Sequence, residues 1–330
     1  MSLISVIVPT YNRAGLIQTC YDSVVAQKHR PLEFLVGDDC STDNTAEVVR
    51  GLPAVEGVTV RYLRLPSNKG ASGARNVAIK AAAGDLVAFL DSDDVWFPDH
   101  LEKLLHALAT SDADVVFSRA AIRESLDSPP SGRSDFGPLP WERENIPEGL
   151  FYYNFVLPSV TLVRRGFFDK VGLFEETARV QHEDWDIFLR AAQAGLKFAH
   201  VPETTAWYMV PASVPEAKTL MMMRRTLGCL EKHYHYPLTP TPRRRFTLGY
   251  YRAWLGMRLG AENAEARGLF LSVLGAGWWH PLLGPAGLSG LLVSCSPAAL
   301  RPLGRRLLAR LFRRVRAHHR AMRGFPDPWD

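Results

Sequence analysis

The chain has 330 residues, 47% of them hydrophobic and 22% charged, which is typical of a folded globular protein and excludes extensive disorder. The formal net charge of +5 comes from one end of the chain, because nine arginines and no acid lie between Arg301 and Arg323. Four widely spaced cysteines without a Cys-x-x-Cys pair argue against a disulfide framework and a cysteine zinc site, and they fit a reducing compartment.

The first 120 residues alternate between strand and helix patterns. The chain begins with an apolar run that lacks a basic flank and soon meets Pro9, which indicates a strand and not a signal peptide. The predicted strands are residues 5–8, 33–36, 58–63, 86–90 and 114–117. The predicted helices are residues 14–27, one opened by a capping box at 44–47, 72–83 and 98–108. This order predicts an α/β fold with a mostly parallel sheet covered by helices on both faces.

The second half of the chain has a different pattern. Residues 124–150 are rich in Ser, Pro, Gly and charge, which predicts a long surface connection or lid. A strand is expected at residues 159–163 and a helix at 184–194, and the chain reads as helical from about residue 215 onward. We therefore expect an α/β domain at residues 1–214 and a helical C-terminal region at residues 215–330.

The last sixty residues raise the question of a membrane. Residues 268–300 carry no charged side chain, but prolines divide them into pieces too short to span a bilayer, so short buried helices are expected. In the final predicted helix, apolar residues follow one face and arginines fill much of the rest. This basic amphipathic helix at 301–323 either docks on its own domain or lies on an anionic membrane surface. Phe312 is the one aromatic residue within the basic run, and this scarcity of aromatic residues argues against a nucleic-acid partner.

Four polar clusters follow predicted strand ends or open a helix. They are residues 9–13 (PTYNR), 38–43 (DDCSTD), 69–76 (KGASGARN) and 91–94 (DSDD). Because the carboxyl ends of parallel strands meet at one edge of a sheet, these clusters are expected to share a crevice.

Three carboxylates within residues 91–94 repel one another unless a cation lies among them. Oxygen-rich ligands favour Mg²⁺ or Mn²⁺, which also bind diphosphates. The plainer interpretation is turn and helix-cap chemistry, which needs only one acid. Neither GxxxxGK[ST] nor a complete GxGxxG is present, so a nucleotide would be held by side chains and metal, with Lys69 and Arg75 facing phosphate oxygens.

A fifth cluster, residues 182–186 (HEDWD), opens the predicted helix at 184–194. Acids in the first turn of a helix are favoured by the helix dipole, so this pattern alone has an ordinary structural explanation. The functional interpretation is that one of its carboxylates faces the crevice as a general base.

Together the five clusters resemble the family 2 glycosyltransferases, which are inverting enzymes with a GT-A fold. The resemblance rests on SVIVPTYNR, DDCSTDNT, NKGASGARN, FLDSDD and HEDWDIFLR, which occur in the family's order within about the first 210 residues. It implies a GT-A sheet, a nucleoside-diphosphate sugar donor, a glycan or lipid-linked acceptor and a divalent cation, Mg²⁺ or Mn²⁺.

The resemblance also implies roles for individual residues. Asp184 matches the catalytic base, Asp91 and Asp93 match the DxD metal element, and Glu183 and Trp185 would lie near the acceptor. Thr10, Tyr11 and Asn12 would line the nucleotide pocket, where Asp39 bonds the base. The full nucleotide-sugar set is Pro9, Thr10, Tyr11, Asn12, Asp39, Lys69, Arg75 and Asp91.

The expected reaction is transfer of a sugar from a donor, a UDP-sugar on this resemblance, in cell-envelope polysaccharide biosynthesis. The expected location is the cytoplasm or the cytoplasmic face of the membrane. One departure is that a Tyr-Arg-x-His stretch of the family corresponds here to Tyr208-Met209-Val210-Pro211. Arg224, Arg225 or the arginines at 243–245 are candidates to supply the missing positive charge.

Two alternatives stay open from the sequence. FLDSDDV at 89–95 also fits the nucleophile loop of a haloacid-dehalogenase-type phosphatase, in which Asp91 would be phosphorylated and Asp93 would be the acid–base. That interpretation leaves the clusters at 9–13 and 38–43 unexplained. The other alternative is a non-catalytic protein that binds sugar nucleotides.

Overall fold

The computed structural model describes residues 2–125, 127–128, 136–176, 182–210, 215–234 and 242–259, together with residues 265, 268 and 269. The chain divides into two compact units, Met1–Ser213 and Val214–Asp330. The expectations for the apolar run beyond residue 269 and for the basic helix at 301–323 lie outside the described residues. Among those described, no helix combines the length and the apolar character needed to cross a bilayer.

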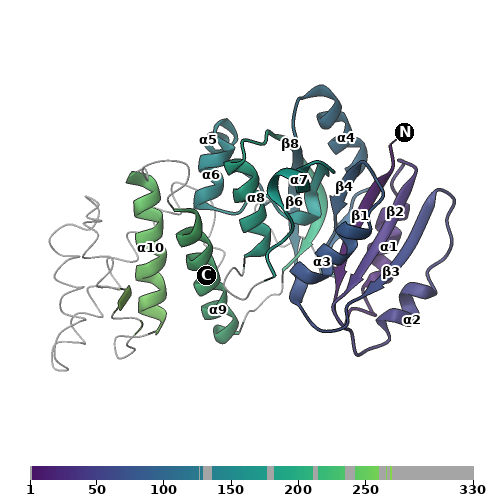
Figure 1. The fold of residues 1–330 in the computed structure, drawn as a ribbon, viewed down its shortest axis with the longest axis horizontal. Coiled ribbons are helices and arrows are strands. Elements are labelled where there is room, and N and C mark those ends of the chain that lie inside the picture. The colour runs from purple at the N-terminus through teal and green to yellow at the C-terminus, as the bar shows by residue number, and fades with distance from the viewer. Residues whose placement is uncertain are drawn as a thin grey trace. The chain divides into compact units, whose positions relative to one another are not determined.

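The first unit is built on an eight-stranded sheet in the order β3-β2-β1-β4-β7-β6-β8-β5 (Figure 1). The strands are β1 (Ile4–Thr10), β2 (Leu32–Asp38), β3 (Val58–Arg64), β4 (Leu86–Phe89), β5 (Val95–Trp96), β6 (Val115–Arg123), β7 (Thr161–Arg164) and β8 (Phe198–Met209). Strands β3, β2, β1 and β4 run parallel, and β6 runs parallel to β8. Strand β7 lies antiparallel between β4 and β6, and β5 lies antiparallel to β8.

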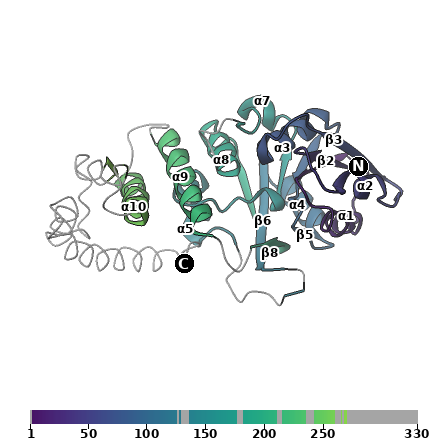
Figure 2. The same cartoon turned by 90° about the horizontal axis from the view of Figure 1, so that it is seen from below.

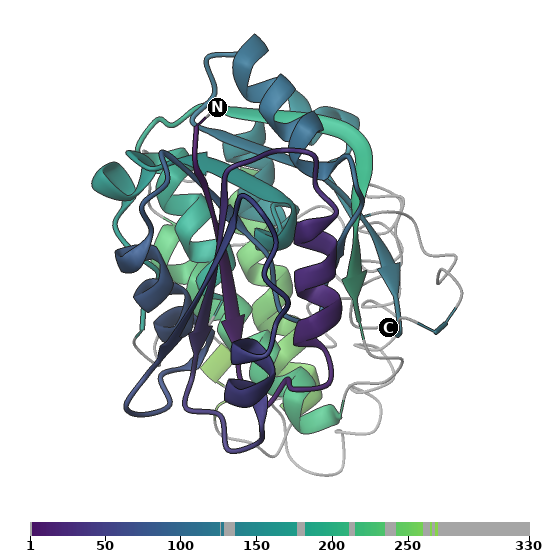
Figure 3. The same ribbon diagram turned by 90° about the vertical axis from the view of Figure 1, so that its right-hand side faces the viewer.

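Helices cover both faces of this sheet, as the sequence predicts. They are α1 (Ile17–Val25), α2 (Thr45–Arg50), α3 (Gly70–Ala81), α4 (His100–Thr110), α5 (Pro140–Glu144), α6 (Ile146–Tyr152), α7 (Phe167–Val171) and α8 (Glu183–Gln193), with a 3-10 turn η1 at Pro158–Val160. Figure 3 shows α1 and α3 on opposite faces of the sheet, and Figure 2 shows α3 and α7 along the same face. Parallel strands linked by right-handed crossovers require this alternation.

The core forms because the central strands are apolar on both sides. All seven residues of β1 and all seven of β2 are buried, which is typical of strands covered on both faces. On one face, alternate β1 residues pack with α1 and α4 in a single apolar cluster. On the other face α3 approaches β2 so closely that a Cβ atom on Gly37 would lie 2.0 Å from the Ala74 carbonyl oxygen.

Two local predictions are wrong. The capping box at Asn44 and Glu47 does not form, because Asn44 makes no side-chain cap bond and Asp43 Oδ1 accepts from the Thr45 amide instead. The helix expected from residue 98 begins at His100, after a short β5 strand and a turn. Helices α5 and α6 together occupy residues 140–152, largely within the segment 124–150 that the sequence predicts to be a surface connection.

The second unit contains α9 (Glu216–His233) and α10 (Pro242–Leu259), which pack on each other. Arg224 of α9 forms a two-pronged ion pair with Glu265, with nitrogen–oxygen distances of 3.0 and 2.7 Å. Arg252 of α10 pairs with Glu231 of α9. The charge of Arg224 is therefore compensated within its own unit.

Candidate functional site

The loops after β1 and β2 are fastened together by Asn12. Its backbone adopts a left-handed conformation, with φ 54°, which Asn tolerates better than most residues. Its side-chain oxygen accepts a hydrogen bond from the backbone amide of Thr42 at 2.8 Å. The backbone amide of Asn12 donates to Ser41 Oγ at 2.9 Å. The predicted clusters at 9–13 and 38–43 thus form one continuous edge of the site.

Asp39 joins this edge to the start of α3. Its two carboxylate oxygens accept from the backbone amides of Lys69, at 2.6 Å, and Gly70, at 2.8 Å. The Asp39 side chain is buried, and burial raises its pKa although the two amides act in the opposite direction. Asp39 therefore anchors the helix in this structure, and base recognition by Asp39 stays a prediction.

The side chains at the end of β1 differ in accessibility. Tyr11 is 46% exposed, which is unusual for so large an aromatic side chain in this fold. Pro9 and Thr10 belong to the buried ladder with β2, where Pro9 lies opposite Gly37. Thr10 Oγ1 is buried without a hydrogen-bond partner among the described residues. Of these three residues, Tyr11 offers a surface on which a planar ring can stack.

Ser159 of η1 forms hydrogen bonds to the acidic loop that follows β4. The hydroxyl of Ser159 accepts from the Asp91 amide at 3.0 Å and donates to the Asp94 carboxylate. The second Asp94 oxygen accepts from the Met209 amide at the end of β8. Asp94 is 1% exposed, and burial followed by the charges of Asp91 and Asp93 raises its pKa. Asp94 is thus a buried support for the loop.

The other two acids of the loop are partly exposed and face basic partners. Asp91 Oδ1 accepts from Arg75 at 2.7 Å, and Asp93 Oδ2 lies 3.4 Å from Arg13. Burial and the neighbouring Asp91 raise the pKa of Asp93, which shows that the repulsion between the two carboxylates is only partly relieved.

This donor set fits a hard divalent cation. Asp91 and Asp93 present carboxylate oxygens, the ligands that Mg²⁺ and Mn²⁺ prefer, and a cation would relieve their mutual repulsion. Within the described part of the chain, no group of three or more His, Cys, Asp or Glu side chains is arranged to hold a metal ion. The two aspartates would therefore need further oxygen ligands from a bound phosphate or water.

Arg75 connects the acidic loop to the start of α8. One terminal nitrogen donates to Asp91 and the other donates to Glu183 Oε1 at 2.9 Å. The guanidinium is 4% exposed and lies 5.3 Å from the centre of the Phe174 ring. Burial lowers the pKa of Arg75, but Asp91 and Glu183 outweigh this effect and raise it, so Arg75 stays charged. Lys69 is more open and pairs with Glu176 at 3.3 Å.

Asp184 lies beside Glu183 in the first turn of α8. Its Oδ2 accepts from Asn154 Nδ2 at 2.8 Å, and its Oδ1 accepts from the Trp185 amide at 2.9 Å. Burial raises the pKa of Asp184, and the charge of Glu183 raises it further. No sequence motif marks Asn154, because it meets Asp184 only through the tertiary fold, from thirty residues earlier in the chain.

The two residues expected near an acceptor are engaged inside the protein. Trp185 is 3% exposed, and its Nε1 donates to the Leu150 carbonyl oxygen of α6 at 2.5 Å. Glu183 is bound to Arg75, whose charge lowers the pKa of Glu183 against the opposing effect of burial. In this structure Trp185 packs in the interior, and Glu183 orients Arg75.

Tyr208 occupies the place where the resemblance expects an arginine-containing element to begin. It stands opposite Ile122 in the β6–β8 ladder, and its ring packs against Phe136 with centroids 5.9 Å apart. Burial raises its pKa, as do the charges of Asp94 and Asp184. The phenol therefore stays protonated close to the acidic loop and the α8 carboxylates.

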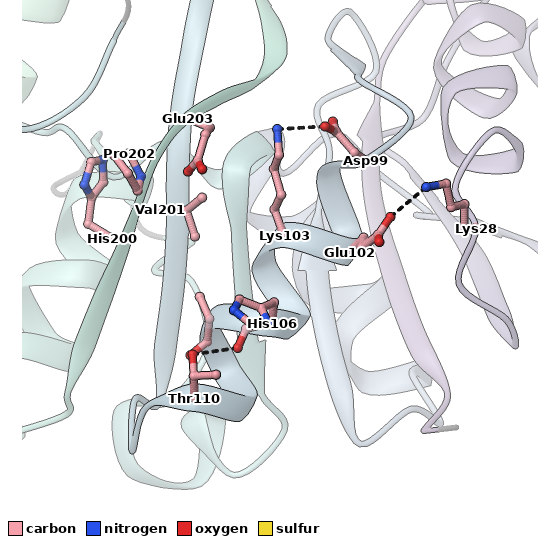
Figure 4. A pocket seen from close by; sticks show the side chains of 11 residues that line it. Lys28, Asp99, Glu102, Lys103, His106, Thr110, His200, Val201, Pro202 and Glu203 are labelled. Atoms are coloured by element: carbon pink, nitrogen blue, oxygen red, sulfur yellow. Dashed lines mark hydrogen bonds and ion pairs between the residues drawn. The ribbon is translucent and has the colours of Figure 1, made fainter.

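A separate hollow of about 620 Å³ lies between α4 and the first half of β8 (Figure 4). Its walls carry two ion pairs, Lys28 with Glu102 and Lys103 with Asp99. None of the predicted site residues lines it. The predicted site residues lie instead in the loops at the carboxyl ends of β1, β2 and β4 and at the starts of α3 and α8.

Comparison with known proteins agrees with this geometry. The family described as Glycosyl transferase family 2 matches residues 5–172. The putative teichuronic acid biosynthesis glycosyltransferase TuaG of Bacillus subtilis strain 168 is 45% identical over 103 residues, 31% of this chain and 40% of its own length. The first curated relatives are matched over less than half of their length.

A longer match links the chain to an Escherichia coli protein described as UDP-Glc:alpha-D-GlcNAc-diphosphoundecaprenol beta-1,3-glucosyltransferase WfaP. The two are 27% identical over 239 residues, 70% of this chain and 86% of WfaP. Among solved structures, residues 1–349 of S. aureus TarS in complex with UDP-GlcNAc match with a TM-score of 0.64. The identity is 18%, over 96% of this chain and 92% of that one, so this likeness concerns the fold, which is of the GT-A type.

Proposed function

Because the chain belongs to glycosyl transferase family 2, we propose that it transfers a sugar, with inversion, from a nucleoside-diphosphate sugar to a hydroxyl group of a glycan or lipid-linked acceptor. Membership of the family makes the chain a glycosyltransferase. The family assignment leaves the phosphatase interpretation without support, since the match includes the clusters that the phosphatase does not explain.

The observation that carries the proposal is the position of Asp184. A carboxylate with a raised pKa lies next to Glu183, which Arg75 links to the acidic loop. A general base works best when its pKa is drawn toward the working pH, and burial beside a second acid does this. Asp184 is therefore the base in our proposal.

The proposed reaction is a single displacement. The acceptor oxygen attacks the anomeric carbon on the face opposite the leaving diphosphate, and the bond from that carbon to the phosphate oxygen breaks. Asp184 takes the acceptor's proton as the new bond forms, and the diphosphate leaves with the electron pair. This sequence inverts the configuration at the anomeric carbon.

The donor would lie along the edge formed by the loops after β1 and β2. Tyr11 is exposed there and suits stacking on a base, and the Lys69 ammonium is open enough to meet a phosphate. Asp39 would share its carboxylate between the start of α3 and the base. We propose that Arg75, which is buried and forms ion pairs with both Asp91 and Glu183, acts on the donor through Asp91.

Asp91 and Asp93 would hold a divalent cation, as their donor chemistry indicates. When bound, such a cation supplies positive charge that stabilises the leaving diphosphate. Arg13 and Lys69 border the same edge and add positive charge to it. Support for a cation also comes from a structural neighbour, a mannosyltransferase from Pyrobaculum calidifontis solved with GDP-Man and Mn²⁺.

We propose a UDP-sugar as the donor and a lipid-linked acceptor. The name of WfaP includes UDP-Glc and a diphosphoundecaprenol acceptor, and the TarS neighbour was solved with UDP-GlcNAc. The names of relatives also include teichuronic acid, amylovoran and succinoglycan biosynthesis, which supports a role in polysaccharide assembly. A lipid-linked acceptor would bring the enzyme to the cytoplasmic membrane face, where the basic segment at 301–323 would contact anionic lipid.

The test is Asp184→Asn, with Asp112→Asn as the matched control. Asp112 is an exposed acid paired with Lys197, so its removal leaves the site unchanged. We expect Asp184→Asn to lower the transfer rate by on the order of 10³-fold, within the range of general-base catalysis. Donor affinity, measured by thermal shift with UDP and GDP sugars with and without Mn²⁺, should be unchanged. Transfer at the normal rate by Asp184→Asn would refute the assignment.

A further inference from the structure

Asn154, which follows α6, is bound to the proposed base in an unusual way. Its Nδ2 donates to Asp184 Oδ2 at 2.8 Å, while its Oδ1 is buried without a hydrogen-bond partner among the described residues. A buried polar atom left without a partner costs about 1–3 kcal/mol. An apolar side chain of similar shape would avoid that cost, so stability alone does not explain an amide at this position.

Docking of α8 on α6 does not explain the amide either. Trp185, the next residue of α8, already ties the two helices through its bond to the Leu150 carbonyl oxygen. The aromatic and aliphatic residues around this bond, including Leu150, Phe151 and Phe188, are buried. The contact between Asn154 and Asp184 is thus an addition to an interface that is already closed.

What the amide does is fix the carboxylate. With Oδ1 of Asp184 held by the Trp185 amide and Oδ2 held by Asn154, the plane of the carboxylate is set from two sides. A base that must accept a proton along one direction gains from such fixation, because misplacement of a catalytic group costs rate.

We infer that Asn154 is a positioning residue for the transfer reaction, whose amide orients the Asp184 carboxylate toward the acceptor hydroxyl. This inference rests on the proposed function, since it takes Asp184 to be the base. Asn154 acts through Asp184 and needs no contact with either substrate.

The same bond also has an electrostatic consequence. The charged and titratable groups that face Asp184 are Glu183 of α8, His182 just before that helix, Arg75 of α3 and Tyr208 of β8. A hydrogen bond donated to a carboxylate favours its charged form. Loss of the Asn154 amide should therefore raise the pKa of Asp184 and move the acidic limb of the rate profile to higher pH.

The experiment compares Asn154→Leu with Asn145→Ala. Leu has nearly the shape of Asn and removes both the donor and the unpartnered oxygen. Asn145 caps α6 from the other end by accepting from the Glu148 amide, so Asn145→Ala tests loss of stability alone. The measurements are Tm, donor affinity and kcat as a function of pH.

For Asn154→Leu we expect an unchanged or higher Tm and a donor affinity within about twofold of the wild type. The kcat should fall by about 10- to 100-fold, which is part of the effect of a general base. The acidic limb of the pH–rate profile should move to higher pH. Asn145→Ala should lower Tm and leave the pH profile in place. If Asn154→Leu lowers Tm and keeps the wild-type kcat and pH profile, Asn154 is structural and the inference fails.

The Asp184→Asn background separates this inference from the proposed function. If Asp184→Asn keeps only a low residual rate, adding Asn154→Leu should lower that residual rate no further, because both changes act on one group. Normal transfer by Asp184→Asn overturns the proposed function. Loss of transfer in Asp184→Asn together with a wild-type pH profile in Asn154→Leu overturns only the role of Asn154.

Discussion

At the scale of single residues, Arg75 is the buried positive charge that pairs with two acids of the site. Its guanidinium is buried between Asp91, in the loop after β4, and Glu183, in the first turn of α8. The charge of Arg75 lowers the pKa of Glu183 against the opposing effect of burial. The same charge partly offsets the rise in the pKa of Asp184 that burial and Glu183 cause.

Replacing Arg75 tests this description. We expect Arg75→Met to destabilise the protein by about 1–3 kcal/mol, since it leaves two partly buried acids without their buried partner. Adding Glu183→Gln should restore part of the loss, because it removes one of the two charges. Urea unfolding of the wild type, both single variants and the double variant measures this coupling. A loss below about 1 kcal/mol in Arg75→Met would mean that the acids find other partners.

At the scale of elements, the short turn η1 supports the acidic loop. Ser159 contacts both ends of that loop, and its carbonyl oxygen also accepts from Trp96 Nε1 at 2.6 Å. A single turn thus sets the conformation of residues 91–96. The loop is shaped by a segment more than sixty residues further along the chain.

Removing the Ser159 hydroxyl should weaken cation binding. Ser159→Ala leaves the Asp91 amide without its partner and Asp94 with one bond fewer, at a cost of about 1–3 kcal/mol. We expect a several-fold higher Mn²⁺ concentration for half-maximal transfer. The control is Ser118→Ala, which removes a buried hydroxyl bonded to Thr205 and should lower stability without changing the Mn²⁺ response. An equal Mn²⁺ response in both variants would show that η1 does not position the loop.

The elements also show what sequence patterns predict and what they miss. The runs that form β1, β2 and β4 are continuously buried and mostly apolar, so their type and order follow from the sequence. Helices α5 and α6 are short and carry a proline at their first or second position, which gives a pattern that resembles a turn. Strand β8 runs for twelve residues with irregular burial and a register shift against β6, so no simple alternation marks it.

The candidate site divides in the same way. Its acids and loop residues stand in compact motifs at strand ends, and the topology of a parallel sheet brings such motifs to one edge. Asn154 and Ser159 lie outside any motif, and their importance depends on distant contacts with Asp184 and Asp94. The burial of Trp185 is likewise a property of the packing between α6 and α8.

At the scale of the whole molecule, acid sensitivity should come partly from His100. The ring is fully buried, stacks on Trp96 and bonds through Nδ1 to Thr205, while Nε2 has no partner among the described residues. Burial lowers its pKa to about 3. The unfolded chain therefore binds this proton near pH 6.5 and the folded chain does not, so stability falls as the pH drops below 6.5.

The expected contribution of His100 between pH 7 and pH 4.5 is about 2–3 kcal/mol of lost stability. His100→Asn keeps a polar group near Thr205 but does not titrate. It should be less stable at pH 7 because of the lost packing, yet its stability should decline less toward pH 4.5. Urea unfolding at several pH values measures the difference between the two slopes. Parallel slopes would show that His100 does not govern the decline.

The clamp that Asn12 forms between the loops after β1 and β2 has a kinetic consequence. Because hydrogen bonds between backbone amides and the Asn12 and Ser41 side chains join the two loops, the exposed Tyr11 ring is held on an ordered edge. A ligand that lands there does not need to freeze a mobile segment, so little entropy is lost on capture. Association at this edge should therefore proceed as a single fast step, and the differences in affinity among ligands should reside in how slowly each one departs.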